Sequence, residues 1–196
     1  MNQQPVMQLN AAHRAALQKH FQHLAGADLR LRFGHAVKPE WLTAYVDAMN
    51  FEDDAVFGVF YVCADDLELA GVAHLALHDD TAEFGVSVLP EYRGRGIGKA
   101  LFERASAYAR NRLVKTFFMH CLAQNAAMMH IARGSGMQIV RDASDADAYL
   151  DLPRSDSASL TDELLAKRVA LFDFALKSQV SIARSISRAI TGGKES

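Results

Sequence analysis

Apolar side chains recur along the chain with two different spacings, and each spacing predicts one type of element. A period of three to four residues indicates a helix with one buried face. We therefore expect helices over residues 10–25, 39–49, 99–112 and 125–133.

Other segments are dense in β-branched and aromatic residues, or alternate between apolar and polar side chains, which predicts strands. Residues 56–89 contain three such segments, separated by the turn-like sequences Ala64-Asp65-Asp66 and His78-Asp79-Asp80-Thr81. This succession predicts an antiparallel meander. Further strands are expected over residues 29–33, 114–122, 137–140 and 148–152. Together the elements predict a mixed α/β (α+β) protein, with helices on both faces of a mixed central sheet.

The chain after residue 152 has a different character. Residues 153–158 have the composition of a linker, and residues 159–191 predict a C-terminal amphipathic helix. Its apolar stripe consists of Leu165, Val169, Phe172, Leu176, Val180, Ala183 and Ile190. Such a stripe either packs back on its own domain or joins two copies in a homodimer. The predicted organisation is an N-terminal helix (1–27), a domain (28–152), the linker and this helix.

The composition and charge of the chain mainly exclude classes of protein. The chain has 196 residues, is half hydrophobic and carries a net charge of −2, so nothing favours a nucleic-acid partner. Its two cysteines, Cys63 and Cys121, do not resemble the disulfide framework of a secreted protein. No apolar run approaches the roughly 20 residues that span a bilayer, and residues 1–10 lack an export signal. We expect a cytoplasmic protein that needs neither a membrane nor a metal.

The most informative segment is Arg93-Gly94-Arg95-Gly96-Ile97-Gly98-Lys99, between a predicted strand and a predicted helix. Alternate glycines let the backbone bring several N–H groups close to a ligand, and a helix N-terminus favours an anion. The two arginines add positive charge for phosphate groups. A dinucleotide loop is excluded because Lys99 stands where its third glycine would be, and a nucleotide triphosphatase loop because Ala100 follows Gly98-Lys99. A pyrophosphate is the expected ligand.

The segment resembles the pyrophosphate loop of the GNAT superfamily of acyl-CoA-dependent N-acyltransferases, whose pattern is (Gln or Arg)-x-x-Gly-x-(Gly or Ala). Asn125 and the later Gly136-Met137 resemble a second motif of these proteins. The resemblance is strong over residues 70–140 and weaker over 28–152, and it extends to the acetyltransferase domain of bacterial protein-lysine acetyltransferases.

What the resemblance implies is a GNAT fold, with splayed central strands that admit acetyl-CoA as the co-substrate. The pantetheine would pair with the backbone of the strand that ends at Leu89, and the loop would hold the pyrophosphate. The implied binding residues are Val86, Ser87, Val88, Arg93, Gly94, Arg95, Gly96, Ile97, Gly98, Lys99 and Asn125.

The reaction of this family is direct attack by an amine on the thioester, which needs a general base. Glu83 is the candidate, because Ala82-Glu83-Phe84 resembles the base-bearing strand of the lysine-acetylating members. Strand periodicity places Glu83 on the same face as Gly85 and Ser87. The alternative is a solvated edge carboxylate. His74, on the preceding strand, is a candidate auxiliary base, or else an ordinary histidine of the sheet.

The reaction also needs an acid that protonates the leaving thiolate, and the sequence offers several candidates for it. Many members of the family place a tyrosine seven residues after the asparagine, where this chain has Ala132. His120, Cys121 and His130 are nearby candidates, although a buried cysteine is more often a small hydrophobe, and water is another source of the proton. The sequence thus favours an N-acetyltransferase (EC 2.3.1) and leaves open a non-catalytic acyl-CoA-binding regulatory or interaction module.

The resemblance also places residues 31–33, Trp41, Tyr45 and residues 50–52 beside the acceptor amine. The acidic run Glu52-Asp53-Asp54 favours a cationic amine if it faces the acceptor, and is otherwise a solvated loop. A small amine, an amino acid and a protein lysine all remain open as acceptors.

Overall fold

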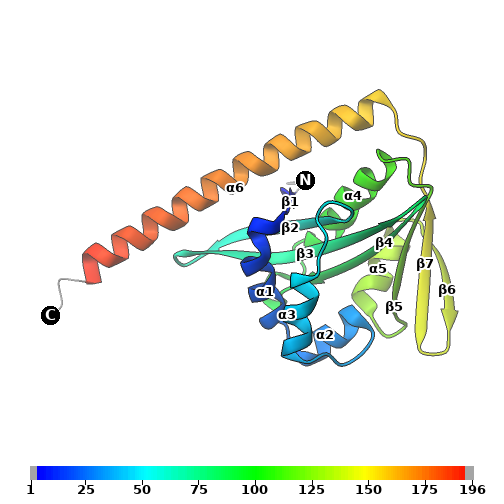
Figure 1. Cartoon of the computed structure of the whole chain (residues 1–196), viewed down its shortest axis with the longest axis horizontal. Coiled ribbons are helices and arrows are strands. Elements are labelled where there is room, and N and C mark those ends of the chain that lie inside the picture. Colours follow the sequence, from blue (N-terminus) through cyan, green and yellow to red (C-terminus); the bar gives the residue numbers. More distant parts are fainter. Residues whose placement is uncertain (1–3, 193–196) are drawn as a thin grey trace.

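The computed structural model describes residues 4–192 as one twisted sheet with helices on both faces and a long C-terminal helix (Figure 1). The sheet has seven strands in the order β1-β2-β3-β4-β5-β7-β6. They are β1 (Met7–Gln8), β2 (Ala55–Cys63), β3 (Asp66–His78), β4 (Thr81–Val88), β5 (Thr116–Leu122), β6 (Gln138–Asp142) and β7 (Asp145–Asp151). The helices are α1 (Arg14–Gln22), α2 (Gly26–Phe33), α3 (Pro39–Asp47), α4 (Ile97–Arg110), α5 (Ala126–Gly134) and α6 (Ser157–Gly192), with short 3₁₀ turns at Ala11–His13 and Pro90–Tyr92. The predicted mixed fold is confirmed.

The sheet opens between its two central strands. β2, β3 and β4 form the predicted antiparallel meander, and β5, β7 and β6 are also antiparallel to one another. β4 and β5 are parallel but pair only from Thr81–Thr116 to Glu83–Phe118. Beyond these pairs β4 continues to Val88 and β5 to Leu122. The carboxyl-terminal halves of the two strands therefore diverge, as expected for a splayed sheet.

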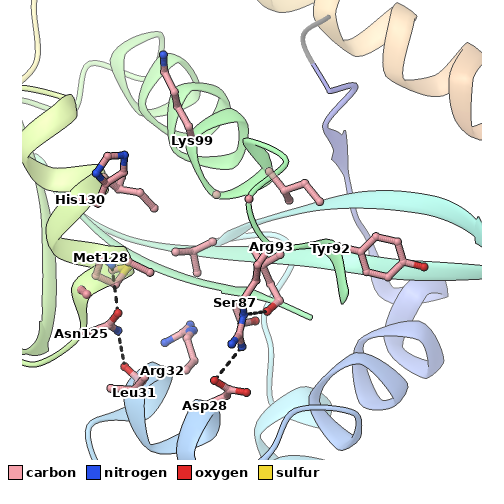
Figure 2. A pocket seen from close by; sticks show the side chains of 18 of the residues that line it. Asp28, Leu31, Arg32, Ser87, Tyr92, Arg93, Lys99, Asn125, Met128 and His130 are labelled. Atoms are coloured by element: carbon pink, nitrogen blue, oxygen red, sulfur yellow. Dashed lines mark hydrogen bonds and ion pairs between the residues drawn. The ribbon is translucent and has the colours of Figure 1, made fainter. Parts of the chain in front are cut away.

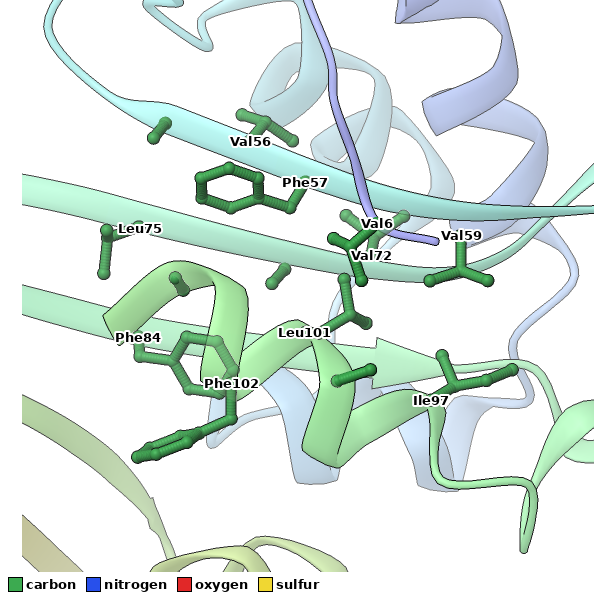
Figure 3. Packing of buried hydrophobic residues seen from close by; sticks show 14 of the residues in the cluster. Val6, Val56, Phe57, Val59, Val72, Leu75, Phe84, Ile97, Leu101 and Phe102 are labelled. Atoms are coloured by element: carbon green, nitrogen blue, oxygen red, sulfur yellow. The ribbon is translucent and has the colours of Figure 1, made fainter. Parts of the chain in front are cut away.

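Helix α4 packs its apolar face on β2, β3 and β4 and places its N-terminus beside the end of β4 (Figure 3). The ring of Phe102 contacts Phe84 and Phe117 at centroid distances of 5.5 and 5.2 Å. Near the first turn, β3 has Gly71, where a Cβ atom would lie 2.5 Å from Cγ2 of Ile97. This close approach fixes the start of α4 against the sheet, and with it the glycine-rich loop.

The expectation of a strand at residues 29–33 is wrong, because these residues form the second half of α2. Five residues of alternating polarity fit a strand, but Leu29 and Phe33 are also four apart, the spacing of one helical face. Leu29 is buried, and the helix ends at Gly34, whose φ of 79° is the left-handed conformation typical of a glycine that ends a helix. As a helix, α2 brings Asp28 to Arg93 of the glycine-rich loop and Arg32 to Gly85 of β4.

Helix α6 begins at Ser157 and packs back on its own chain, but not through the predicted apolar stripe, whose side chains are exposed. Its inner face covers the edge of the sheet near β1 and β2, where the rings of Phe174 and Phe60 lie 4.9 Å apart. Lys177 Nζ donates to the Phe60 carbonyl at 2.7 Å, and the Ser181 hydroxyl donates to the Asp65 carbonyl at 2.5 Å. Its outer face leaves apolar side chains exposed, among them Leu165, Val169, Phe172, Leu176, Val180 and Ile190. Within residues 4–192 no helix is long and apolar enough to cross a membrane.

Candidate active site

A cavity of about 630 Å³ lies where β4 and β5 diverge (Figure 2). Its walls come from α2, the end of β4, the glycine-rich loop, the first turn of α4 and the first turns of α5. Every predicted binding residue except Arg95 lines it: Val86, Ser87, Val88, Arg93, Gly94, Gly96, Ile97, Gly98, Lys99 and Asn125. The fold thus brings together three separate segments of the chain, within residues 24–32, 86–99 and 124–131.

The glycine-rich loop has the geometry of an anion site. Gly94 and Gly96 have φ angles of 74° and 77°, a left-handed conformation that glycine adopts without strain. Among the described residues no side chain caps the N-terminus of α4, so none of them supplies a capping partner for its first N–H groups. At Gly98 a Cβ atom would lie 3.1 Å from Ile131 Cδ1, so this glycine allows α4 to approach α5 closely. A pyrophosphate fits this geometry, because N–H groups and the helix dipole both favour an anion.

The three cationic side chains of the loop have different surroundings. Arg93 Nη2 forms an ion pair with Asp28 Oδ1 of α2 at 2.8 Å, and Arg93 Nε donates to the Val88 carbonyl at 3.2 Å (Figure 2). Lys99 is exposed and lies 3.6 Å from Glu103. Arg95 turns out of the cavity, and its guanidinium lies over the rings of Tyr61 and Tyr92. Arg93 is therefore the loop arginine at the cavity, and Asp28 holds its head group there.

Ser87, on the strand edge of the cavity, is held by a buried histidine of α1. His20 Nδ1 donates to the Leu69 carbonyl at 2.7 Å, so its Nε2 accepts the hydrogen bond from Ser87 Oγ at 2.8 Å. His20 is only 1% exposed. Its pKa is lowered from 6.5 to about 4, mainly by burial and to a smaller extent by the charges of His23 and Arg32, while the bond to Leu69 opposes the shift. The neutral imidazole thus ties α1 to the part of β4 that lines the cavity.

We expect this histidine to make the protein less stable in mild acid. Because the folded pKa lies below 6.5, the unfolded chain takes up the proton first, and the free energy of unfolding falls as the pH drops from 6.5 toward 4. The loss is roughly 3 kcal/mol by linkage, and none of it arises above pH 6.5. Urea unfolding at several pH values should show a shallower acid slope for His20→Gln than for the wild type. The exposed His78, replaced by Gln, is the control, and equal slopes in all three proteins would contradict this role.

Asn125 lines the cavity but already has partners in its own chain. Its Oδ1 accepts a hydrogen bond from the Met128 N–H at 3.1 Å, which caps the first turn of α5. Its Nδ2 donates to the Leu31 carbonyl of α2 at 3.1 Å (Figure 2). The side chain is buried and fixes α5 relative to α2. Its predicted contact with the CoA arm stays a prediction.

Glu83 is exposed on β4, two residues before Gly85 and four before Ser87. Gly85 and Ser87 face the N-terminal helices, because Arg32 lies against the first and His20 bonds the second. Strand alternation places Glu83 on that same face. The negative charge of Glu83 also acts on the pKa values of Tyr45 and His74. The candidate base therefore lies outside the cavity, three residues before Val86 on β4 and near Tyr45 of α3.

Next to Glu83 a chain of hydrogen bonds connects α2, α3, β3 and the loop that precedes β2. His74 Nε2 donates to Asp54 Oδ2 at 2.9 Å, Tyr45 donates to His74 Nδ1 at 2.8 Å, and Arg32 Nη2 approaches the Tyr45 hydroxyl at 3.3 Å. Burial lowers the pKa of His74 below its ordinary value, although the bond to Asp54 opposes this. Burial likewise raises the pKa of Tyr45. His74 is therefore a neutral link in this network, and Asp54 is one of its members rather than a solvated loop residue.

Of the three side chains named as candidates for the general acid, only His130 lines the cavity. Ala132 is buried, His120 is exposed and bonded to Asp147 at 2.7 Å, and burial raises the pKa of the Cys121 thiol. His130 lines the cavity from α5, on the same side as Lys99 (Figure 2). Tyr92 also lines it, but its hydroxyl donates to Glu68 at 2.7 Å, away from Asn125 in Figure 2. Within residues 4–192 no cluster of His, Cys, Asp and Glu could hold a metal.

Three features of this site were not predicted from the sequence. They are the roles of Asp28 and His20, and the contact of the Arg32 side chain with β4. Asp28, and the contact of Arg32 with β4, were missed because a strand was expected at residues 29–33, where the structure has a helix. The spacing of four between them, which puts both on one side of a helix, was the available signal. His20 gave none, because its partners Leu69 and Ser87 are far away in the chain.

Comparison with known proteins places this chain among the acetyltransferases. The profile of the acetyltransferase (GNAT) family matches residues 21–137, more than half of the chain. The protein belongs to the GNAT acetyltransferase family. A search of curated proteins by sequence finds no match.

Solved structures with the same fold include three bacterial proteins. The GNAT domain of S. lividans PAT has a TM-score of 0.63 at 18% identity, over 75% of this chain and 89% of that one. The ribosomal-protein-S18-alanine N-acetyltransferase from Escherichia coli has a TM-score of 0.59 at 17% identity, over 78% and 96%. The spermidine N-acetyltransferase from Vibrio cholerae, in complex with CoA and spermine, has a TM-score of 0.61 at 16% identity, over 78% and 97%. At these identities the likeness concerns the fold.

Proposed function

We propose that the protein transfers the acetyl group of acetyl-CoA to a primary amine by direct attack, with Glu83 as the general base. The observation that carries this proposal is the alignment of three features along β4. The anion-binding loop follows the end of the strand, the cavity runs beside Val86 to Val88, and Glu83 lies further back on the same strand. A co-substrate with a pyrophosphate at one end and a thioester at the other suits this arrangement.

The loop and the strand would hold acetyl-CoA. The N–H groups at the start of α4 and the Arg93 guanidinium would bind the pyrophosphate, and backbone groups of β4 would pair with the pantetheine. Bound acetyl-CoA supplies an acetyl thioester, whose thiolate is a good leaving group. Val88 already uses its carbonyl as an acceptor for Arg93, so Arg93 also supports the strand edge that the pantetheine would meet.

The acceptor enters as an ammonium ion and loses one proton to the Glu83 carboxylate. The amine nitrogen then forms a bond to the acetyl carbon, and the bond between that carbon and sulfur breaks, with its electron pair leaving on sulfur. The nitrogen gives up its second proton as the amide forms, and the thiolate takes it up directly or through water. Because Ala132 stands where many related enzymes have a tyrosine, we assign no side chain to this last transfer.

Titration calorimetry of acetyl-CoA into the purified, CoA-free protein tests the binding half of the proposal. We expect Arg93→Ala to weaken binding by about 10- to 100-fold, because a hydrogen-bonded charge pair is worth about 1.5–3 kcal/mol. Arg133→Ala, which removes an exposed arginine of α5 outside the cavity, should leave the affinity unchanged. No binding by the folded wild-type protein would rule out the proposal.

The second candidate function is a non-catalytic acyl-CoA-binding regulatory or interaction module, which the buried Ala132 favours. Acetyl-CoA binding without turnover on any amine, amino acid or lysine peptide would select it. A homodimer through the outer stripe of α6 and a cytoplasmic location both stay predictions from the sequence.

A further inference from the structure

The side chain of Arg32 lies directly on β4, in a space that only a glycine leaves free. A Cβ atom on Gly85 would be 2.3 Å from Arg32 Cζ and 2.4 Å from each terminal nitrogen. Gly85 stands midway between Glu83, the candidate base, and Ser87 at the cavity. Arg32 also lines the cavity. Its guanidinium therefore lies between the cavity and the candidate base, where acyl group and acceptor would meet.

This guanidinium forms no ion pair within the described part of the chain. Among the ion pairs of residues 4–192, none involves Arg32, whereas Arg93 at the same cavity is paired with Asp28. The contacts of Arg32 are the Tyr45 hydroxyl at 3.3 Å and the face of the Phe33 ring at 4.9 Å. A half-buried cation without a counter-charge is unfavourable, and a planar guanidinium suits a carboxylate in a two-point hydrogen bond.

The neighbours of Arg32 hold it in place for such a partner. Tyr45 accepts from Arg32 and donates to His74, which in turn donates to Asp54. The indole of Trp41 stacks on the Tyr45 ring at 5.3 Å with an interplanar angle of 9°, and Phe33 meets both rings edge-on. A side chain fixed in this way loses little conformational entropy when a ligand binds.

We propose that Arg32 binds a carboxylate of one of the two reacting molecules, an inference that rests on the proposed acyltransferase function. The carboxylate has two chemical sources. One is the free end of a dicarboxylic acyl group, as in succinyl-CoA. The other is the α-carboxylate of an amino-acid acceptor, whose amine would then lie toward Glu83.

Two titrations of the full chain distinguish these sources. The first compares succinyl-CoA with acetyl-CoA. The second compares the proteinogenic amino acids with their methyl esters, and each ligand is added to protein saturated with CoA. The methyl ester keeps the amine but loses the negative charge of the carboxylate. We expect the carboxylate-bearing ligand to bind about 10- to 100-fold more tightly in one of the two comparisons.

Variants then assign that preference to Arg32. In Arg32→Gln the affinity ratio of the two ligands should fall close to one, and Arg32→Lys should restore part of it. Arg30→Gln removes an exposed arginine from the same helix and should keep the wild-type ratio. A ratio near one in both wild-type comparisons, or an unchanged ratio in Arg32→Gln, would overturn the inference.

The acetyl-CoA titration separates this inference from the function on which it rests. If acetyl-CoA binds and neither comparison discriminates, only the role of Arg32 is lost. If acetyl-CoA itself does not bind the folded protein, the proposed function fails, and the inference fails with it.

Discussion

Replacing Glu83 with glutamine is expected to lower kcat at neutral pH by about 10²- to 10⁴-fold, the usual contribution of a general base. Glutamine keeps the size of the side chain and removes its ability to take a proton. Glu83 does not line the cavity, so the Kd for acetyl-CoA should not change. The loss should shrink as the pH approaches the pKa of the acceptor amine, because a larger share of the amine is then already neutral.

Steady-state kinetics from pH 7 to 10, with calorimetry for acetyl-CoA, would measure both effects. Glu40→Gln, at an exposed glutamate of α3, is the matched control and should behave as the wild type. A rise in the KM for the amine with little change in kcat would mean that Glu83 binds a cationic acceptor and is not the base. Wild-type turnover would remove Glu83 from the mechanism.

Replacing Glu163 with alanine is expected to lower the free energy of unfolding by about 3–5 kcal/mol, because it leaves a buried charge unpaired. Glu163 is on α6 and faces Arg104 of α4, whose side chain is only 7% exposed. Its carboxylate lies 3.5 Å from Arg104, accepts from Asn111 at 2.7 Å and accepts from Arg112 at 3.2 Å.

The environment of Arg104 explains why the loss should be large. Burial lowers the pKa of the guanidinium, and the charge of Glu163 opposes this. Nε and Nη1 of Arg104 have no hydrogen-bond partner within residues 4–192. The attraction of Glu163 is thus a large part of what compensates this cation.

Urea unfolding of four proteins would test the pair. Glu163→Ala and Arg104→Met each break it, and the double variant Glu163→Leu with Arg104→Met replaces it by apolar contacts and should recover most of the loss. Glu103→Ala removes an exposed carboxylate that pairs with Lys99, and should change stability by less than about 0.5 kcal/mol. A loss below about 1 kcal/mol for Glu163→Ala would mean that water already solvates Arg104.

The local features of the fold could be predicted from the sequence because short stretches of chain determine them. The meander over residues 56–89, α4 and α5 follow from periodicity, and their turns from short polar sequences. The alternate glycines of the loop predicted a backbone free to turn tightly, and Gly94 and Gly96 adopt left-handed conformations there. The mixed fold follows from the succession of these elements, whereas the family and the cavity-lining residues of β4 and the loop were implied by the resemblance of the loop to the GNAT superfamily.

What the sequence could not give were contacts between distant segments. The sequence of residues 29–33 fits a strand or a helix equally well. Only the burial of Leu29 in the folded protein decides for the helix. That decision turns Asp28 toward Arg93 and Arg32 toward Gly85. Likewise the stripe on α6 predicted a helix with an apolar side, but the edge of the sheet selects which face is buried.

The sequence by itself therefore determined the family, the order of elements from residue 39 onward and the glycine-rich loop, because these depend on residue type and spacing. The tertiary structure alone decided how charge is distributed in the site. It paired Arg93, left Arg32 without a carboxylate, and made His74 a neutral link between Tyr45 and Asp54. The physical reason is that the state of a charged group depends on burial and on partners within a few ångströms, which the fold brings from remote parts of the chain.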